Sequence, residues 1–506
     1  MSECSNLALD FLSNAERQGN RLALSVQGVD YSYSDLTVLV GQIAAWLRLR
    51  GVGVGSRVGV LASRSLETFG GVLGACWVGA TYIPINVGLP GKVLANFVRS
   101  LGLHALIVDS RGLTALDGEV LDLPPSHVLA PESCALPDPL RDGPVCVQPD
   151  ETAYIEFTSG TTGMPKGVMI SVGAISHFLS VMYDRYKLRP EDRVAATSDI
   201  TFDISFANMF MAWRAGASLH VVPSTQLMAP SRFIRERQIT VWFSVPSIAT
   251  FMRQMKLLKP AAFPCLRYSL FAGEPLPLDS ALAWQQAAPD SSVENLYGPT
   301  EATVVCTVER VNKQSGVTPG RGVIPIGRPL PGTDVAIVDS ALSFLPPNHE
   351  GQIALAGIQL SQGYYGQPKL TKECFPLIDG RKWYLTGDRG YKDSVGVFHH
   401  LGRIDNQVKV LGHRVELEEV ETHLRDICKS DMVAVVAWPI EHGSAQGLVA
   451  FIGGTTCSPS EVKEEMKNRV VSYIVPQTVR VLDGLPLNSS GKIDRRALLQ
   501  LLGSDH

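Results

Sequence analysis

The residues with the clearest chemical potential form a loop at 158–167, with the sequence TSGTTGMPKG. Four hydroxyl residues, three glycines and one lysine share these ten positions. Glycines let backbone N–H groups curl toward an anion, hydroxyl groups add donors, and a lysine supplies a mobile positive charge. We therefore expect a phosphate-binding loop. Its expected contacts are Thr158, Ser159, Gly160, Thr161, Thr162 and Lys166.

This loop differs from the P-loop of nucleotide triphosphatases. The P-loop requires Gly-Lys-Ser/Thr, whereas Pro165, Lys166 and Gly167 stand here, so the hydroxyl that binds magnesium in that family is missing. A flexible surface linker is the plainer alternative, but Gly/Ser/Thr linkers rarely carry a Pro-Lys-Gly ending. The sequence favours a phosphate site of another kind.

The elements that must position this loop alternate between helices and strands. From about 35 to 125, helix-like text such as DLTVLVGQIAAWLRLRG alternates with β-branched runs such as VGVLAS and HALIVD. This alternation favours parallel strands with crossover helices. After a Pro-rich connection, the strand-like run AYIEFTS leads directly into the loop. Helix and strand patterns alternate again from 170 to 300, and β-rich text continues to about 400.

A change of composition near Asp405 predicts a domain boundary. Charged, amphipathic text (VELEEVETHLRDI) and two strand-like runs follow it. The 506 residues also exceed what one ordinary hydrophobic core organises. We expect an α/β fold with a large N-terminal domain at 1–404, made of αβ sub-lobes and a β-rich sub-lobe. A small, mobile α+β domain is expected at 405–506.

The overall composition limits the classes of partner. A formal net charge of −4 provides no field that would gather nucleic acid or anionic lipid. The nine cysteines include no CxxC pair, so the pattern suggests neither a zinc site nor a disulfide framework. The N-terminal residues lack the pattern of a signal peptide, and no run reaches roughly 18 apolar residues. We expect a cytoplasmic protein without nucleic-acid or membrane partners.

Seven further motifs accompany the loop at 158–167. In chain order they are YSYSDL near 31, WVGATYIPIN at 77–86, FDIS at 202–205, NLYGPTE at 295–301, YLTGDRG at 384–390, GRIDNQVKVLGHRVELEEVE at 402–421 and NSSGKIDR at 488–495. Together they resemble the signatures of the adenylate-forming superfamily of acyl-CoA synthetases, luciferases and peptide-synthetase adenylation domains. The resemblance covers nearly the whole chain. It implies that ATP activates a carboxylic acid as an acyl-adenylate, which then passes its acyl group to a thiol.

The resemblance also implies ATP and Mg²⁺ as cofactors. Beyond the loop, the expected nucleotide contacts are Gly273, Glu274, Asn295, Tyr297, Gly298, Thr300, Asp388 and Arg403. Tyr297 offers an aromatic face and Asn295 an amide to adenine, while Asp388 can accept hydrogen bonds from ribose hydroxyls. The implied ligand for Mg²⁺ is the carboxylate of Glu301.

Two residues near the C-terminal part have implied roles in catalysis and motion. Lys492 corresponds to the lysine that holds the substrate carboxylate and the α-phosphate while charge develops, a use of preorganised positive charge. Asp405 resembles the family's hinge residue. Rotation of the small domain about Asp405 after adenylation would withdraw Lys492 and admit a phosphopantetheine thiol.

Counting from the motifs gives the residues expected around the acid. They are Asp203, Ile204, Ala207, Phe243, Leu270, Ala272, Leu296, Val304 and Val305, with Lys492. A lysine for the carboxylate and an aspartate for an α-ammonium describe an amino acid, because a buried aspartate facing a fatty acid would lie unpaired. The eight apolar residues predict an uncharged substrate side chain of small to medium size.

This set resembles the pocket of stand-alone prolyl-AMP ligases, which load L-proline onto a peptidyl carrier protein in pyrrole and cyclic-imine alkaloid pathways. D-Alanine, valine or another small neutral amino acid is the alternative substrate. No carrier domain is apparent in the chain, so we expect the thiol on a separate phosphopantetheinylated carrier protein, with CoA as the alternative acceptor. A non-catalytic nucleotide-binding homologue is the alternative outside enzymes.

Overall fold

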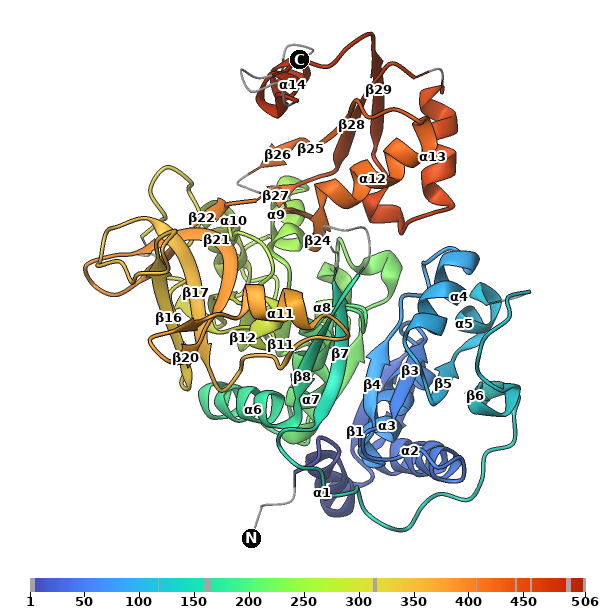
Figure 1. Cartoon of the computed structure of the whole chain (residues 1–506). Coiled ribbons are helices and arrows are strands. Elements are labelled where there is room, and N and C mark those ends of the chain that lie inside the picture. Colours follow the sequence, from blue (N-terminus) through green and yellow to red (C-terminus); the bar gives the residue numbers. More distant parts are fainter. Residues whose placement is uncertain are drawn as a thin grey trace.

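A computed structural model describes residues 5–116, 118–158, 165–312, 316–405, 407–441, 444–455, 457–487 and 493–503. Figure 1 shows the elements that follow Asp405 at the top of the view, with the remaining sheets and helices below them. Each helix in these ranges is too short or too polar to cross a membrane.

A seven-stranded sheet carries the loop at 158–167. Its strands, in spatial order, are β18 (Gly363–Tyr364), β8 (Lys166–Ser171), β7 (Thr152–Thr158), β4 (Thr81–Pro84), β3 (Arg57–Leu61), β5 (Ala105–Val108) and β6 (Val128–Leu129). The four strands from β4 to β6 run parallel, with helices between them in sequence, as the alternating pattern predicts. The antiparallel pair β7 and β8 holds the two ends of the loop, because Thr158 pairs with Lys166.

A nine-stranded sheet forms the second large layer. Its strands, in spatial order, are β15 (Arg328–Pro329), β14 (Thr307–Arg310), β13 (Ser292–Tyr297), β12 (Tyr268–Phe271), β11 (Val241–Ser244), β9 (Arg193–Ala196), β10 (Ser218–Val221), β1 (Leu22–Val26) and β2 (Val29–Ser32). The carboxyl ends of β11, β12 and β13 lie side by side because these strands are parallel. Residues that follow these ends therefore meet at one edge of the sheet.

Helix α7 (Ile204–Arg214) lies between the two large sheets. Its Phe206 stacks on Tyr154 of β7 and on Tyr82 of β4, with ring centroids 3.9 and 4.8 Å apart. On the other side, Trp213 donates a hydrogen bond to the Ala23 carbonyl in β1. A helix covered on both faces is expected to be apolar all round, and every residue from Ile204 to Trp213 is buried.

Other α-helices precede Asp405 among the described residues. They are α1 (Leu9–Gln18), α2 (Tyr33–Arg48), α3 (Leu66–Trp77), α4 (Gly91–Ser100), α5 (Ser110–Ala115), α6 (Val172–Tyr186), α8 (Ser231–Glu236), α9 (Pro246–Gln254), α10 (Leu278–Ala287) and α11 (Pro368–Cys374). The motif YSYSDL starts α2, because Ser32 and Asp35 form a reciprocal capping box at its N-terminus.

A four-stranded antiparallel sheet accounts for the β-rich text before 400. It comprises β16 (Thr333–Val338), β17 (Gly351–Gly357), β21 (Tyr384–Lys392) and β22 (Phe398–Arg403), beside the short hairpin β19 (Leu377–Ile378) and β20 (Arg381–Lys382). In β21 and β22, Asp388 pairs with Arg403. The register thus places Asp388, the expected acceptor for the ribose hydroxyls, beside Arg403, another expected nucleotide contact.

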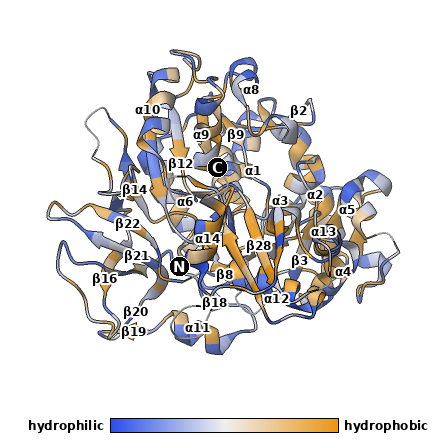
Figure 2. Ribbon diagram, turned by 90° about the horizontal axis from the view of Figure 1, so that it is seen from above, coloured by the Kyte–Doolittle hydropathy of each residue, from blue (hydrophilic) through white to orange (hydrophobic). Residues whose placement is uncertain are grey.

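Two small sheets follow Asp405. One contains β24 (His413–Glu416), β23 (Gln407–Val410), β27 (Ser444–Ala445) and β26 (Ile440–Glu441), and the other β25 (Val433–Ala437), β28 (Leu448–Gly453) and β29 (Thr478–Leu482). Helices α12 (Leu417–Cys428), α13 (Pro459–Lys467) and α14 (Arg495–Gly503) accompany them. Figure 2 shows β28 in the orange of apolar residues, and this strand is buried along its whole length. The mixed α/β architecture agrees with the fold class expected from the sequence.

Candidate active site

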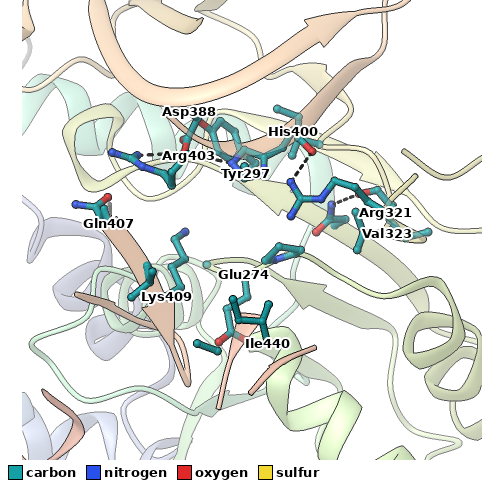
Figure 3. Close-up of a pocket in the computed structure, with 18 of the residues that line it drawn as sticks. Glu274, Tyr297, Arg321, Val323, Asp388, His400, Arg403, Gln407, Lys409 and Ile440 are labelled. Carbon is teal, nitrogen blue, oxygen red and sulfur yellow. Dashed lines mark hydrogen bonds and ion pairs between the residues drawn. The ribbon is translucent and has the colours of Figure 1, made fainter. Parts of the chain in front are cut away.

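A cavity of about 300 Å³ opens between the nine-stranded sheet, the four-stranded sheet and the segments after Asp405, at the lower end of the roughly 300–1,000 Å³ typical of small-molecule sites. Seven of the expected nucleotide contacts line it, namely Gly273, Glu274, Asn295, Tyr297, Gly298, Asp388 and Arg403. Gln407 and Lys409 line it from the other side (Figure 3). The structure therefore brings together expected contacts that lie up to 130 positions apart in the sequence (403 − 273).

The carboxylate of Asp388 has three side-chain partners at this cavity. Tyr297 Oη donates to it at 2.5 Å, Arg403 Nη1 at 3.1 Å, and His400 Nε2 lies 3.2 Å away. Burial alone would raise the pKa of Asp388, but His400 and Arg403 hold that pKa well below its usual range. Asp388 is therefore an ionised acceptor at the cavity wall. His400 was not predicted from the sequence.

Asn295 presents an unpaired acceptor to the cavity. Its Nδ2 donates to the carbonyls of Ile324 and Pro325 at 3.2 and 2.8 Å, whereas its buried Oδ1 has no partner among the described residues. Buried polar atoms are nearly always satisfied, so an orphan acceptor at a cavity suits a donor on a ligand. The exocyclic amino group of adenine is such a donor. The residues present therefore fit an adenine nucleotide.

Gly298 is required by a close approach of the backbone. A Cβ at this position would lie 2.5 Å from Val305 Cα and 2.8 Å from the Val304 carbonyl oxygen. Both atoms belong to the backbone and cannot move aside easily. The glycine in NLYGPTE therefore lets the end of β13 pack against the segment that carries two of the predicted acid-pocket residues.

The carboxylate of Glu301 is fully buried and already paired. Arg414 Nη1 lies 3.1 and 3.2 Å from its two oxygens, and Tyr364 Oη donates to it at 2.8 Å. Burial would raise the pKa of Glu301, but Arg414 and Tyr364 lower it, so the group is ionised. One protein carboxylate beside substrate phosphates is a usual Mg²⁺ environment. Glu301 fits that role. In this structure, however, its negative charge is paired with Arg414.

Lys166, the predicted phosphate cation, has a similar engagement. Its Nζ lies 3.6 Å from Glu416 Oε1, and both side chains are largely buried. Thr158 Oγ1 is buried and has no partner among the described residues. The other predicted loop contacts, Ser159, Gly160, Thr161 and Thr162, and the predicted catalytic Lys492 lie outside the described residues.

The hairpin of β23 and β24 makes these contacts. In Figure 3 the side chain of Lys409 points into the cavity toward Asp388. At the tip, His413 stacks on Tyr473 at a centroid distance of 3.8 Å and meets the edge of Phe202 at 5.2 Å. The hairpin is thus inserted between the predicted metal, phosphate and acid residues. Lys409, Arg414 and Glu416 were not among the predicted site residues, although all three belong to the motif at 402–421.

The predicted hinge residue is held by a predicted nucleotide contact. Arg403 donates through Nε and Nη2 to both carboxylate oxygens of Asp405, at 2.9 and 2.6 Å. Its Nη1 reaches Asp388 and the Thr386 carbonyl. One guanidinium therefore connects the expected ribose site to the start of the segment after 405.

Nine of the predicted acid-pocket residues lie in the part of the chain before Asp405. Eight of them are apolar and buried in its main hydrophobic core: Ile204, Ala207, Phe243, Leu270, Ala272, Leu296, Val304 and Val305. Asp203 stands at the N-terminus of α7 and accepts a hydrogen bond from Thr300 Oγ1 at 2.9 Å. Burial raises the pKa of Asp203 to about 6. A carboxylate in this environment would be stabilised by a cationic partner.

The wall that contains Val304 and Val305 is strained and clamped. Thr303 and Val304 have φ of 56° and 66°, a region that β-branched residues rarely adopt. Thr303 Oγ1 donates to the Gln359 carbonyl at 2.6 Å, and Gln359 Nε2 donates to the Val305 carbonyl at 2.9 Å. Gln359 therefore positions this wall, and no motif in the sequence analysis pointed to it.

Comparison with protein families identifies this arrangement. Residues 11–365 match the family of AMP-binding enzymes, which is most of the chain. Tyrocidine synthase 1 of Brevibacillus parabrevis is 29% identical over 501 residues, covering 96% of this chain and 44% of that protein. The δ-poly-L-ornithine synthetase of Acinetobacter baumannii is 31% identical over 508 residues, covering 97% of this chain and 36% of that protein. The chain thus spans less than half the length of these curated relatives.

A solved structure matches the chain from end to end. The Vibrio cholerae adenylation domain AlmE, solved in complex with glycyl-adenosine-5′-phosphate, has a TM-score of 0.89 and 31% identity, with 100% of this chain and 98% of that chain covered. IdnL7 is similar, with a TM-score of 0.73 and 32% identity. The protein belongs to the AMP-binding family of adenylate-forming ligases. Within it, the chain is similar to the adenylation domains of nonribosomal peptide synthetases.

Proposed function

We propose that this protein activates an amino acid as an aminoacyl-adenylate at the expense of ATP and transfers it to a thiol. The observation that carries the proposal is the pairing of two sites at one edge of the nine-stranded sheet. One is the nucleotide cavity with the orphan acceptor of Asn295, and the other is the predicted acid site, with eight buried apolar residues and the partly buried carboxylate of Asp203. The related AlmE, solved with an aminoacyl adenylate, supports the same chemistry.

The proposed substrate is L-proline. Asp203 would bind the α-ammonium, and the eight buried apolar side chains would surround a small uncharged side chain. A fatty acid would leave Asp203 buried without a partner, which costs several kcal/mol by the usual penalty of roughly 3–5 kcal/mol for an uncompensated buried charge. D-Alanine and other small neutral amino acids fit the same charge pattern.

In the first half-reaction the substrate carboxylate attacks the α-phosphate of ATP and pyrophosphate leaves. Asp388 would hold the ribose hydroxyls, and Lys166 and the loop at 158–162 would hold the outer phosphates. Lys492 would stabilise the charge that develops between carboxylate and α-phosphate. Mg²⁺, when bound at Glu301, would neutralise phosphate charge.

In the second half-reaction a thiol attacks the acyl carbonyl and AMP leaves. We propose that segments 1–404 and 405–506 act as separate bodies about Asp405, and that the described arrangement serves this second step. Its support is that Arg414 and Glu416 engage Glu301 and Lys166, the two side chains that the first step needs for metal and phosphate. The proposed acceptor is the phosphopantetheine thiol of a separate carrier protein.

ATP–pyrophosphate exchange across a substrate panel tests this function. The panel contains L-proline, D-alanine, L-valine, L-alanine, glycine and a fatty acid. Exchange led by L-proline supports the full proposal, and exchange led by another amino acid retains the ligase but rejects the side-chain assignment. Thioester formation compared on a phosphopantetheinylated carrier and on CoA then separates the two acceptors.

A further inference from the structure

Strand β7 places a second acidic side chain in the interior beside Asp203. Glu156 is 2% exposed, and neither of its carboxylate oxygens has a hydrogen-bond partner among the described residues. No lysine, arginine or histidine in those residues forms an ion pair with it. An ionised carboxylate without any partner is among the most costly groups to bury. Its retention in a strand interior calls for a partner that arrives with a ligand.

The direction of Glu156 follows from the alternation along β7. Ile155 and Phe157 pack on one face of the sheet, in the cluster beneath α4. Glu156 lies on the opposite face with Tyr154, whose ring stacks on Phe206 of α7. Because Asp203 stands at the N-terminus of α7, Glu156 points toward the same end of that helix.

Electrostatic coupling agrees with this geometry. Burial raises the pKa of Glu156 well above its ordinary value, and the nearby charges of Asp203 and Asp199 raise it further. The hydroxyl groups of Tyr82 and Tyr154 also lie in the interior without partners among the described residues. Glu156 therefore lies among buried polar groups of β4, β7 and the start of α7 whose hydrogen bonds are incomplete among the described residues.

A cationic ligand would stabilise the carboxylates of Asp203 and Glu156 when both are ionised. Asp203 and Glu156 repel one another when both are ionised, so one stays protonated until a positive group enters. Asp199 is different, because Ser63 donates to it at 2.6 Å and Thr201 approaches it at 3.3 Å. Glu156 is therefore the carboxylate of this group whose oxygens are still open to a ligand.

We propose that Glu156 is a second carboxylate for the α-ammonium group of the bound amino acid, acting opposite Asp203. This inference rests on the proposed function and adds a specificity-determining residue to it. The apolar residues around the substrate side chain come from α7, β11, β12, β13 and the segment after them. Glu156 comes from β7 in the other sheet, which places it on the ammonium side of Asp203 rather than among those apolar walls.

Two amide-linked adenylate analogues test the inference without turnover. One is the non-hydrolysable prolyl sulfamoyl adenosine, and the other carries an oxygen in place of the ring nitrogen, so that only the ammonium differs. Calorimetry on the full chain gives both dissociation constants. We expect Glu156→Gln to weaken the ammonium-bearing analogue by about 10- to 100-fold, as for one lost charge-assisted hydrogen bond, and to leave the oxygen analogue within about twofold.

Proton release gives a readout that a structural role would not move. At pH 7.5, in buffers of different ionisation enthalpy, the wild type should release protons when the ammonium-bearing analogue binds, because Glu156 ionises on meeting the cation. Glu156→Gln and Glu156→Leu should lose that release. Glu156→Gln should unfold near the wild-type temperature, because a neutral amide replaces a protonated acid of the same shape, and Glu156→Leu at that temperature or higher, because it removes a buried unpaired polar group. Asp199→Asn is the matched control and should keep both the release and the difference between the analogues.

The outcomes separate clearly. A loss of affinity confined to an analogue with a side-chain ammonium, such as the ornithyl compound, would assign Glu156 to the substrate side chain instead and overturn the α-ammonium assignment. Equal affinities of wild type and Glu156→Gln for every analogue would overturn the proposal, because Glu156 would then make no contact with the ligand. Failure of these analogues and of the glycyl, alanyl and valyl compounds to bind the wild type would reject the proposed function itself, which is a distinct result.

Discussion

The ion pair between Arg414 and Glu301 yields the sharpest prediction about the two half-reactions. Glu301 is 0% exposed, and Arg414 contacts both of its oxygens. Removing one partner of such a buried pair costs about 3–5 kcal/mol, because the other charge stays buried without compensation. Arg414→Gln should therefore destabilise the arrangement with the inserted hairpin by that amount, relative to any arrangement in which Glu301 binds Mg²⁺.

The two half-reactions report this change separately. A penalty of about 3 kcal/mol corresponds to a slowing of roughly 10²-fold, so thioester formation on pantetheine should fall by that factor in Arg414→Gln. ATP–pyrophosphate exchange should stay within about threefold of the wild type, because adenylation does not use the pair. Each rate is measured with saturating substrates, and thermal unfolding checks that the variant is folded.

Arg381→Gln is the matched control for this experiment. Its partner Asp334 forms an exposed pair with it at 2.5 Å, and both side chains are about half exposed. Exposed pairs contribute roughly 0–1 kcal/mol, so neither half-reaction should change. The reasoning fails if Arg414→Gln slows both half-reactions equally, or if thioester formation keeps its wild-type rate.

Three further predictions concern the amino acid and the lysine. Lys492→Ala should slow ATP–pyrophosphate exchange by about 10²-fold or more, as for a lost preorganised charge. Transfer from supplied aminoacyl-adenylate to pantetheine should keep its rate. Near-normal exchange in this variant would show that Lys492 has no catalytic role. Asp203→Asn should raise the KM for the amino acid at least tenfold, by roughly 1.4 kcal/mol or more, with an unchanged KM for ATP; an unchanged amino-acid KM would place Asp203 outside the pocket. Burial raises the pKa of Asp203 to about 6, and Asp203 must be ionised to pair with an ammonium group. The KM for the amino acid should therefore rise about tenfold per pH unit as the pH falls below about 6. A KM that stays constant from pH 7 to pH 5 would contradict this pairing.

The sequence predicts the parts of the site that are local. The run AYIEFTS becomes β7, and the motifs NLYGPTE and YLTGDRG place Asn295, Tyr297 and Asp388 at one cavity. Asn295 and Tyr297 lie in β13 and Asp388 in β21 of another sheet, so the family resemblance of the motifs, rather than local geometry, predicted that they meet. The pairing of Asp388 with Arg403 across β21 and β22 is the local part. The α/β class followed from the alternation of helices and strands, which is local too.

Contacts between distant segments could not be predicted from the sequence. Arg414 meets Glu301 across 113 positions, and this contact depends on how the segment after Asp405 lies against the large sheets. Gln359 was missed because its clamp on the strained Val304 wall is visible only in three dimensions. Glu156 looked like one polar residue in an apolar strand, and its significance depends on the absence of a described partner around it.

Formation of an aminoacyl-adenylate can be tested in a single-turnover reaction with L-proline and ATP labelled at the α-phosphate. We expect labelled prolyl-adenylate to accumulate on the protein. It should convert to AMP and a prolyl thioester when a phosphopantetheine thiol is added. Labelled adenylate formed with another amino acid would correct the substrate only. Absence of any labelled aminoacyl-adenylate, in a protein that binds ATP, would contradict the account.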